Sequence, residues 1–200
     1  MLDTQLAQIL HEKYALSQVT EKAETGISTL YAASNTWGSS TAEVELFNEP
    51  VSEDAARTIG QVAGSLQWLE DPAVVRIRDC GVTQDGRLYV VRDEAHGSAL
   101  RSLIDGRVKW GTPFTYQEAE RLLGPVAKAI DRFNASGHPN FLARSIDPDH
   151  LLVQQGAPVV PVVLTLAGPT AGAAGLVSES KNRRQFSEVV SQLTSKPVDE

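Results

Sequence analysis

One amphipathic helical pattern, with β-strand patterns on both sides of it, restricts the possible folds of this chain more than any other feature. It starts behind Ser52, with Glu53 and Asp54 in its first turn, where carboxylates favour the positive end of the helix dipole. Pro72 closes it. Its apolar residues recur every three or four positions, as one face of an α-helix requires. They are Ala55, Ile59, Val62, Leu66 and Leu69.

Short apolar runs predict β-strands both before and after this helix. Three strands are expected before it and two after it, over residues 14–19, 27–33, 42–47, 74–81 and 88–92. A lead-in helix over residues 1–12 precedes the strands, and a polar turn is expected at 21–26. A turn at Gln84-Asp85-Gly86 joins the last two strands. Residues 1–92 are therefore expected to form one α+β lobe.

Helical patterns dominate after Arg92, so residues 93–200 are expected to form a second lobe of the same domain. The predicted helices cover residues 98–103, 116–134 and 183–193, and a hairpin covers 151–166. Gly124-Pro125 interrupts the middle helix, and an internal proline costs about 3 kcal/mol. We expect a kink or two abutting helices there. The Gly- and Ala-rich residues 167–175 predict a flexible segment.

Composition and charge exclude several classes of function. The chain is 42% hydrophobic and 22% charged, which is typical of a globular protein. Its net charge of −7 argues against nucleic-acid binding, which needs a concentrated basic surface. The single cysteine, Cys80, excludes an internal disulfide and a multi-cysteine metal site. Its place in a predicted strand favours a small buried residue over a nucleophile. A single cysteine also fits a reducing, cytoplasmic compartment.

Three phrases of the sequence resemble parts of the protein kinase fold. GRLYVVRDEAHGSALRSL resembles the last small-lobe strand, the hinge and the first large-lobe helix. LARSIDPDHLLV resembles the catalytic loop, and VVLTLAGP resembles the strand before the metal-binding motif. The resemblance implies an α+β, kinase-like two-lobe fold with a five-stranded small lobe and a truncated, mainly helical large lobe.

The nucleotide-binding positions of that family carry other residues here. Kinases fold a Gly-x-Gly-x-x-Gly loop over the phosphates and place a lysine on the third strand. The glycine places correspond to Ala23, Thr25 and Ser28, and the lysine place corresponds to Phe47. The glutamate that would orient the lysine corresponds to Val62. Since removing both partners of an ion pair is often neutral or stabilising, we expect apolar packing in its place.

The catalytic and metal-binding positions are altered as well. The His-Arg-Asp pattern corresponds to Ala143-Arg144-Ser145, and the asparagine of the same loop corresponds to His150. Leu166 stands where Asp-Phe-Gly has its aspartate. Ser145 cannot accept a proton as a carboxylate does, and His150 is a poor magnesium ligand. The resemblance is therefore to a pseudokinase, with no catalytic residue, no metal and no cofactor.

A narrower resemblance is to actinobacterial pseudokinase domains fused to the cytoplasmic end of the lipid II flippase (MviN/MurJ-type). It rests on the Asp-Pro-Asp-x-Leu-Leu-Val phrase, the shortened activation segment and the single final helix. It implies that an active Ser/Thr kinase phosphorylates a threonine, which a forkhead-associated (FHA) domain protein binds to restrain peptidoglycan precursor export. Such a chain is cytoplasmic, either free or tethered at the inner face of the plasma membrane through a parent protein.

Thr170 is the predicted phosphorylation site. It lies in the flexible segment, where a kinase can reach it, and a phosphate there adds about −2 charge. Thr165, Ser178 and Ser180 are the alternatives, and an ordinary loop role for Thr170 stays open.

Several other residues allow two interpretations. Asp147 and Asp149 flank Pro148, an arrangement that favours turn-stabilising hydrogen bonds over an acid–base pair. A hydrogen-bonding role suits His150 better than a ligand role. Trp68, off the main stripe of its helix, is either a contact anchor or partly buried.

Two functions compete with a phosphorylation-dependent binding module. One is an atypical nucleotide-binding, kinase-like phosphotransferase, which the altered cleft positions disfavour. The other is a constitutive docking surface that needs no modification.

Overall fold

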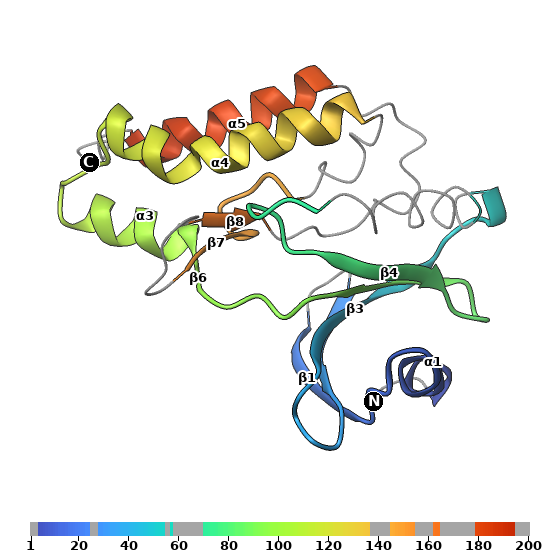
Figure 1. Ribbon diagram of the computed structural model, residues 1–200. Helices are drawn as coiled ribbons and strands as arrows, with labels where there is room; N and C mark the ends of the chain where they lie inside the picture. Colours follow the sequence, from blue (N-terminus) through green and yellow to red (C-terminus); the bar gives the residue numbers. More distant parts are fainter. Residues whose placement is uncertain are drawn as a thin grey trace. The chain divides into compact units, whose positions relative to one another are not determined.

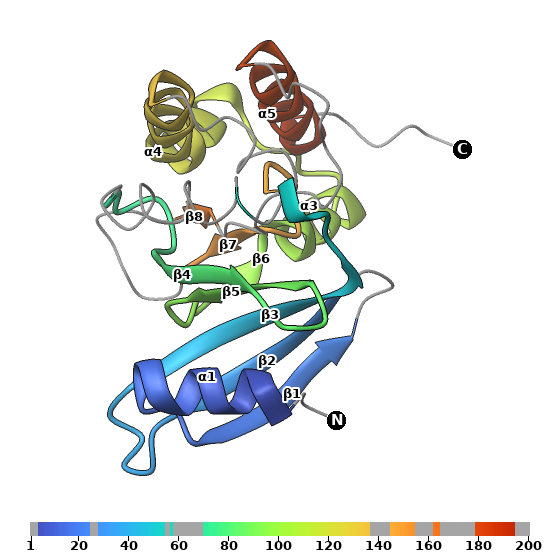
Figure 2. The same cartoon turned by 90° about the vertical axis from the view of Figure 1, so that its right-hand side faces the viewer.

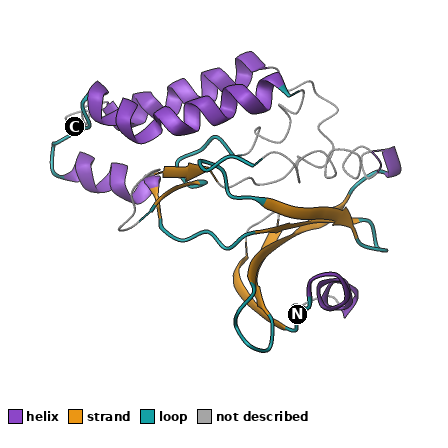
Figure 3. Cartoon of the chain, in the orientation of Figure 1, coloured by secondary structure: helices purple, strands orange, loops and turns teal. Residues whose placement is uncertain are grey.

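The computed structural model describes residues 4–24, 28–54, 57, 70–136, 145–154, 162–164 and 179–194. The chain divides into two compact units. The first unit contains residues 1–70 and 76–94, and the second contains residues 71–75 and 95–200. In the described residues, the first unit contains the longer strands, whereas the second contains long helices and three short strands (Figure 3). The mixed α+β class expected from the sequence is confirmed.

The first unit is built on a five-stranded antiparallel sheet with the order β1-β2-β3-β5-β4. Its strands are β1 (Gln18–Glu24), β2 (Ser28–Ser34), β3 (Thr41–Pro50), β4 (Ile77–Val82) and β5 (Arg87–Arg92). Strand β3 is the central strand and pairs with β2 on one side and β5 on the other. Between β4 and β5, Gly86 has a φ of +84°, which the turn requires and which glycine adopts without strain.

Helix α1 (Thr4–Tyr14) covers one face of this sheet, which confirms the predicted lead-in helix. Figure 2 shows it lying across the strands. Leu6 and Leu10 of the helix and Leu16 after it are fully buried against Val44 and other apolar residues of the sheet. Burying one leucine side chain stabilises the fold by about 1.5–3 kcal/mol, so these three contacts hold α1 in place.

The strand predicted over residues 14–19 overlaps β1 only at residues 18–19, and the polar turn predicted at 21–26 is wrong for residues 21–24, the part of it that the structure describes. Helix α1 continues to Tyr14, and β1 begins only at Gln18 and runs through Glu24. Strand β1 lies at the edge of the sheet with most of its side chains exposed. An edge strand of this kind needs no apolar alternation, and charged residues there protect it from pairing with other chains.

The helix predicted behind Ser52 is only partly described. Glu53, Asp54 and Arg57 are helical, and the Arg57 guanidinium pairs with the Asp54 carboxylate at 3.3 Å. Val62 and Trp68 lie outside the described residues.

The second unit combines three helices with a small sheet. The helices are α3 (Leu100–Lys109), α4 (Tyr116–Ala135) and α5 (Glu179–Thr194), and the strands are β6 (Ser98–Ala99), β7 (Leu151–Val153) and β8 (Val162–Leu164). The antiparallel sheet has the order β6-β7-β8, and β7 and β8 form the predicted hairpin. Helices α4 and α5 lie side by side (Figure 1). Val74, expected in a strand with β4, instead forms an isolated parallel bridge with Leu164.

Two helix predictions for this unit need correction. The short helix expected at 98–103 is a two-residue strand followed by a helix that continues to Lys109. Helix α4 is a single helix through Gly124-Pro125, so two abutting helices are wrong. A capping box at its start, in which Thr115 and Glu118 exchange hydrogen bonds, and a buried inner face that includes Phe133 offset the hydrogen bond that Pro125 cannot donate.

Candidate functional site

Of the positions at which the kinase pattern is altered, the structure describes Ala23, Ser28, Phe47, Ser145 and His150. Val62 and Leu166 lie outside the described residues, as does the predicted phosphorylation site Thr170. The other undescribed candidates are Thr25, Ala143, Arg144, Thr165 and Ser178.

Two of the predicted nucleotide-binding positions come together in the first unit. Phe47, at the predicted lysine place on β3, lies directly opposite Ser28, a predicted glycine place, on β2. Both residues are buried, at 5% and 3% exposure. The sheet therefore places the two residues assigned to the lysine place and to a glycine place next to each other, as a buried aromatic ring and a buried hydroxyl.

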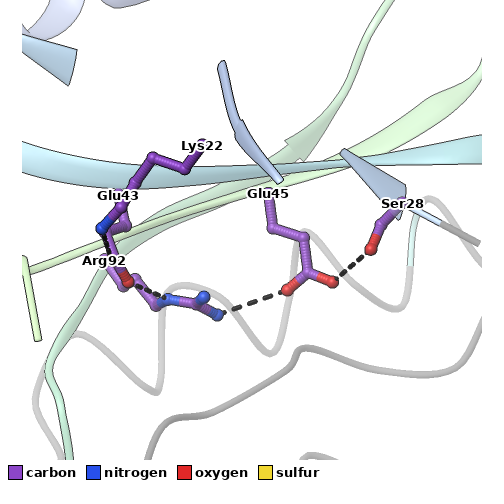
Figure 4. A network of polar contacts seen from close by, with 5 residues as sticks. All are labelled: Lys22, Ser28, Glu43, Glu45 and Arg92. Atoms are coloured by element: carbon purple, nitrogen blue, oxygen red, sulfur yellow. Dashed lines mark hydrogen bonds and ion pairs between the residues drawn. The ribbon is translucent and has the colours of Figure 1, made fainter. Parts of the chain in front are cut away.

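A network of polar side chains, most of them buried, continues from Ser28 along the same face (Figure 4). The Ser28 hydroxyl donates to the Glu45 carboxylate at 2.7 Å, and the Arg92 guanidinium donates to Glu45 at 3.3 Å and to Glu43 at 3.2 Å. The Lys22 ammonium donates to the second oxygen of Glu43 at 2.7 Å. We call these five residues the β3 network.

The alternation of β3 explains how this network forms. Successive side chains of a strand point to opposite faces, so Glu43, Glu45 and Phe47 share one face. Val44 and Leu46 point to the other face, toward α1. Strand β5 lies next to β3 with Arg92 paired to Glu43, which brings the guanidinium between the two carboxylates. Because both faces of β3 are covered, every residue from Ala42 to Phe47 is buried.

The β3 network is balanced in charge. Lys22 and Arg92 contribute two positive charges, and Glu43 and Glu45 contribute two negative charges. Charges removed from water must be paired, since an isolated buried charge costs several kcal/mol. The pairing explains how a strand with two glutamates can lie inside the fold.

Sequence reasoning missed this network. The expected packing of Phe47 against Val62 lies outside the described residues, and the ionic groups on the same face of β3 were not predicted. The available signal was the pattern Glu43-x-Glu45 within a central, otherwise apolar strand. Alternation alone places these glutamates in solvent, and their partners Lys22 and Arg92 are distant in sequence, so the pairing could not be read from the pattern.

In the second unit, hydrogen bonds within the loop stabilise the segment that resembles a catalytic loop. The Asp147 carboxylate accepts from the Asp149 N–H at 2.9 Å, and the Asp147 carbonyl accepts from the His150 N–H at 3.0 Å. This turn-stabilising role of Asp147 confirms the interpretation favoured from the sequence. Partial burial and the neighbouring Asp147 raise the pKa of Asp149, against the opposing effect of Arg101. Ser145 is completely buried, and His150 is half-buried.

A second polar cluster ties α1 to the sheet of the first unit. The Tyr14 hydroxyl donates to the Asp79 carboxylate, and the Lys13 ammonium pairs with the same carboxylate at 3.4 Å. Burial and the bond to Asp79 raise the pKa of Tyr14. Cys80 is buried as predicted, and its burial raises the pKa of the thiol to about 12. A thiol with so high a pKa is protonated at neutral pH and is not a nucleophile.

Within the described residues, no group of three or more His, Cys, Asp or Glu side chains is arranged to hold a metal ion. Over the same part of the chain, no helix combines the length and apolarity needed to cross a membrane.

Comparisons with known proteins give a likeness of fold. No protein-family model and no curated protein sequence matches the chain. Among solved structures, the kinase domain of PknI from Mycobacterium tuberculosis superimposes with a TM-score of 0.68 at 16% identity, over 92% of this chain and 76% of that one. A double mutant of the same domain gives a TM-score of 0.69 at 15% identity, with the same coverage. The predicted α+β, protein kinase-like fold is thereby confirmed.

Proposed function

We propose that this kinase-like domain is catalytically inactive and acts as a phosphorylation-dependent regulatory binding module. The observation that carries the proposal is the composition of β3. Phe47 occupies the predicted lysine place, and the buried carboxylates of Glu43 and Glu45 share its face. A lysine on this strand pairs with the phosphates of ATP in a working kinase. An aromatic ring cannot replace it, and carboxylates repel phosphate.

The second unit supports the same proposal. A kinase needs a carboxylate in the catalytic loop to accept the proton of the substrate hydroxyl. Ser145 has no carboxylate and is fully buried, and the nearby Asp147 uses its carboxylate to close the turn. The described residues of the loop therefore support a structural role.

The partners of the module are proposed from the narrower resemblance. An active Ser/Thr kinase would phosphorylate Thr170, and an FHA-domain protein would bind the phosphothreonine. The readout would be control of peptidoglycan precursor export, with the domain in the cytoplasm, either free or tethered through a flippase. Of the alternative sites, Ser180 is exposed in the first turn of α5.

The experiment is treatment of the chain with an active bacterial Ser/Thr kinase, followed by mass spectrometry and calorimetric titration with an FHA domain. We expect one dominant phosphothreonine, and FHA binding only after treatment. Thr170→Ala should abolish binding, and Thr165→Ala is the matched control. Equal binding before and after treatment would instead indicate a constitutive docking surface.

Magnesium and ATP test the competing enzyme function. A ligand at 100 times its dissociation constant stabilises a protein by about 2.7 kcal/mol, which raises the melting temperature by several degrees. We expect no shift with ATP and magnesium. A clear shift accompanied by phosphoryl transfer to a protein substrate would establish a phosphotransferase.

A further inference from the structure

The β3 network contains the side chains that a phosphate site would use, already bound to carboxylates. Arg92 is 5% exposed and lies between Glu43 and Glu45, and its guanidinium donates to both. Lys22, whose side chain is 38% exposed, donates to the remaining oxygen of Glu43. The network therefore connects Lys22, a cation that solvent reaches, to Arg92, a cation that is buried.

Carboxylates and phosphates compete for the same donors. The guanidinium fork of arginine matches the oxygens of either group, and lysine binds phosphate as a point charge. Two carboxylates together carry the charge of about one phosphate dianion. Glu43 and Glu45 thus present to Arg92 and Lys22 the charge and the acceptor oxygens that a phosphate group would present.

We propose that the β3 network is a phosphate site closed by the chain's own carboxylates. Glu43 and Glu45 act as an internal anion that occupies Arg92 and Lys22 and excludes inorganic and nucleotide phosphates from this face of the sheet. The inference deepens the proposed function. It rests on the proposal that the wild-type chain binds no nucleotide. It adds a cause for that absence besides the missing lysine, namely an autoinhibitory contact.

Substitutions distinguish closure by the glutamates from the loss of the lysine, because the two explanations predict different effects on phosphate binding. If the face is closed by Glu43 and Glu45, Phe47→Lys alone will not produce phosphate binding, because the introduced ammonium meets the Glu45 carboxylate on the same face. Neutralising the two glutamates will produce it. The net charge of the network then changes from zero to +2, and the amide side chains keep the size of the glutamates.

The experiment is isothermal titration of the whole chain with pyrophosphate, comparing the wild type, Phe47→Lys and Glu43→Gln/Glu45→Gln. We expect the double variant to bind at least about tenfold more tightly than the wild type, a difference of about 1.4 kcal/mol. Phe47→Lys should match the wild type. Adding Arg92→Gln to the double variant removes the buried cation, and binding should return to the wild-type value.

Glu45→Gln alone provides a milder test if the double variant does not fold, because the Lys22–Glu43–Arg92 pairing remains. It should gain pyrophosphate binding, to a smaller extent. The proposal is overturned if neither glutamine variant gains affinity, if Phe47→Lys gains as much as they do, or if the gain survives Arg92→Gln. Titration of the phosphorylated variants with the FHA domain keeps the two proposals separate. Reader binding should be unchanged, and its absence in the wild type would count against the proposed function alone.

Discussion

The two faces of strand β3 achieve burial by different means. Toward α1, Val44 and Leu46 belong to an apolar cluster that includes Leu6, Leu10 and Leu16. On the opposite face, Glu43 and Glu45 are equally buried but depend on Arg92 and Lys22. The apolar face is stabilised by the area removed from water and tolerates local change, whereas the ionic face is stable only while its charges are paired. One strand therefore combines two means of burial, one that depends on apolar area and one that depends on paired charges.

The largest expected effect comes from breaking the ionic face. Arg92→Leu leaves Glu43 and Glu45 buried without the guanidinium, and removing one partner of a buried pair costs about 3–5 kcal/mol. We expect a loss of that size in the unfolding free energy, measured by urea denaturation at pH 7. Arg184→Leu is the control, because Arg184 is 81% exposed and its ion pair should contribute less than about 1 kcal/mol.

A compound variant separates the charges from the space they fill. Replacing Glu43, Glu45 and Arg92 together by methionine removes every strongly buried charge of the network. Such replacements are often neutral or stabilising, so the unfolding free energy should recover most of the loss seen for Arg92→Leu. If the compound variant is as unstable as the single one, the comparison of the two faces is wrong.

The apolar face should respond to the loss of one side chain by a smaller amount. Leu10 of α1 is fully buried, and Leu10→Ala should lower the unfolding free energy by about 3 kcal/mol through lost transfer energy and a cavity. Gln8→Ala, on the exposed side of the same helix, should change it by less than about 0.5 kcal/mol. Equal effects of the two substitutions in urea denaturation would mean that α1 does not cover the sheet.

The same contrast shows what could be predicted from the sequence. Periodicity located the lead-in helix and the succession of strands along the chain, because apolar burial leaves a regular local pattern. For Glu43 and Glu45 of β3 the same pattern is misleading, because alternation predicts that they are exposed and they are buried. Their burial depends on Arg92, which β5 brings beside β3 from far along the chain. Strand β1 was misplaced for a related reason, because an exposed edge strand has no apolar face to detect.

At the candidate site, the turn made by the Asp147 carboxylate was predicted and is confirmed. The kinase correspondences of Phe47 and Ser28 stay predictions, and the register that sets them opposite each other was not predicted. The hydrogen bond from Ser28 to Glu45 depends on rotamers and on the register of three strands, which local sequence does not encode.

Cys80 provides a titratable probe of burial in the sheet. Its pKa rises from 9.0 to about 12 in the folded chain, so folding retains a proton that the unfolded chain releases. The stabilisation is complete below pH 9 and is lost as the pH rises from 9 toward 12, at about 1.4 kcal/mol per pH unit. Between pH 8 and pH 10 the wild type should lose about 1 kcal/mol more unfolding free energy than Cys80→Ala. Identical pH dependence of the two proteins would show that the thiol is not buried.

The smallest effect expected concerns the residue that turns the chain from α1 into the sheet. Ala15 has a φ of +54°, the left-handed conformation that terminates helices, and its N–H donates to the His11 carbonyl at 3.0 Å. Alanine is strained there, so Ala15→Gly should raise the unfolding free energy by about 0.5 kcal/mol, the relief of strain exceeding the added freedom of the unfolded chain. Ala7→Gly, within α1, is the matched control and should lower it by about 0.5–1 kcal/mol. Changes of opposite sign in the unfolding free energy for these two substitutions would place the end of α1 at Ala15. Leu16 then enters the apolar face directly after the helix. The same sign for both would place the end of the helix elsewhere.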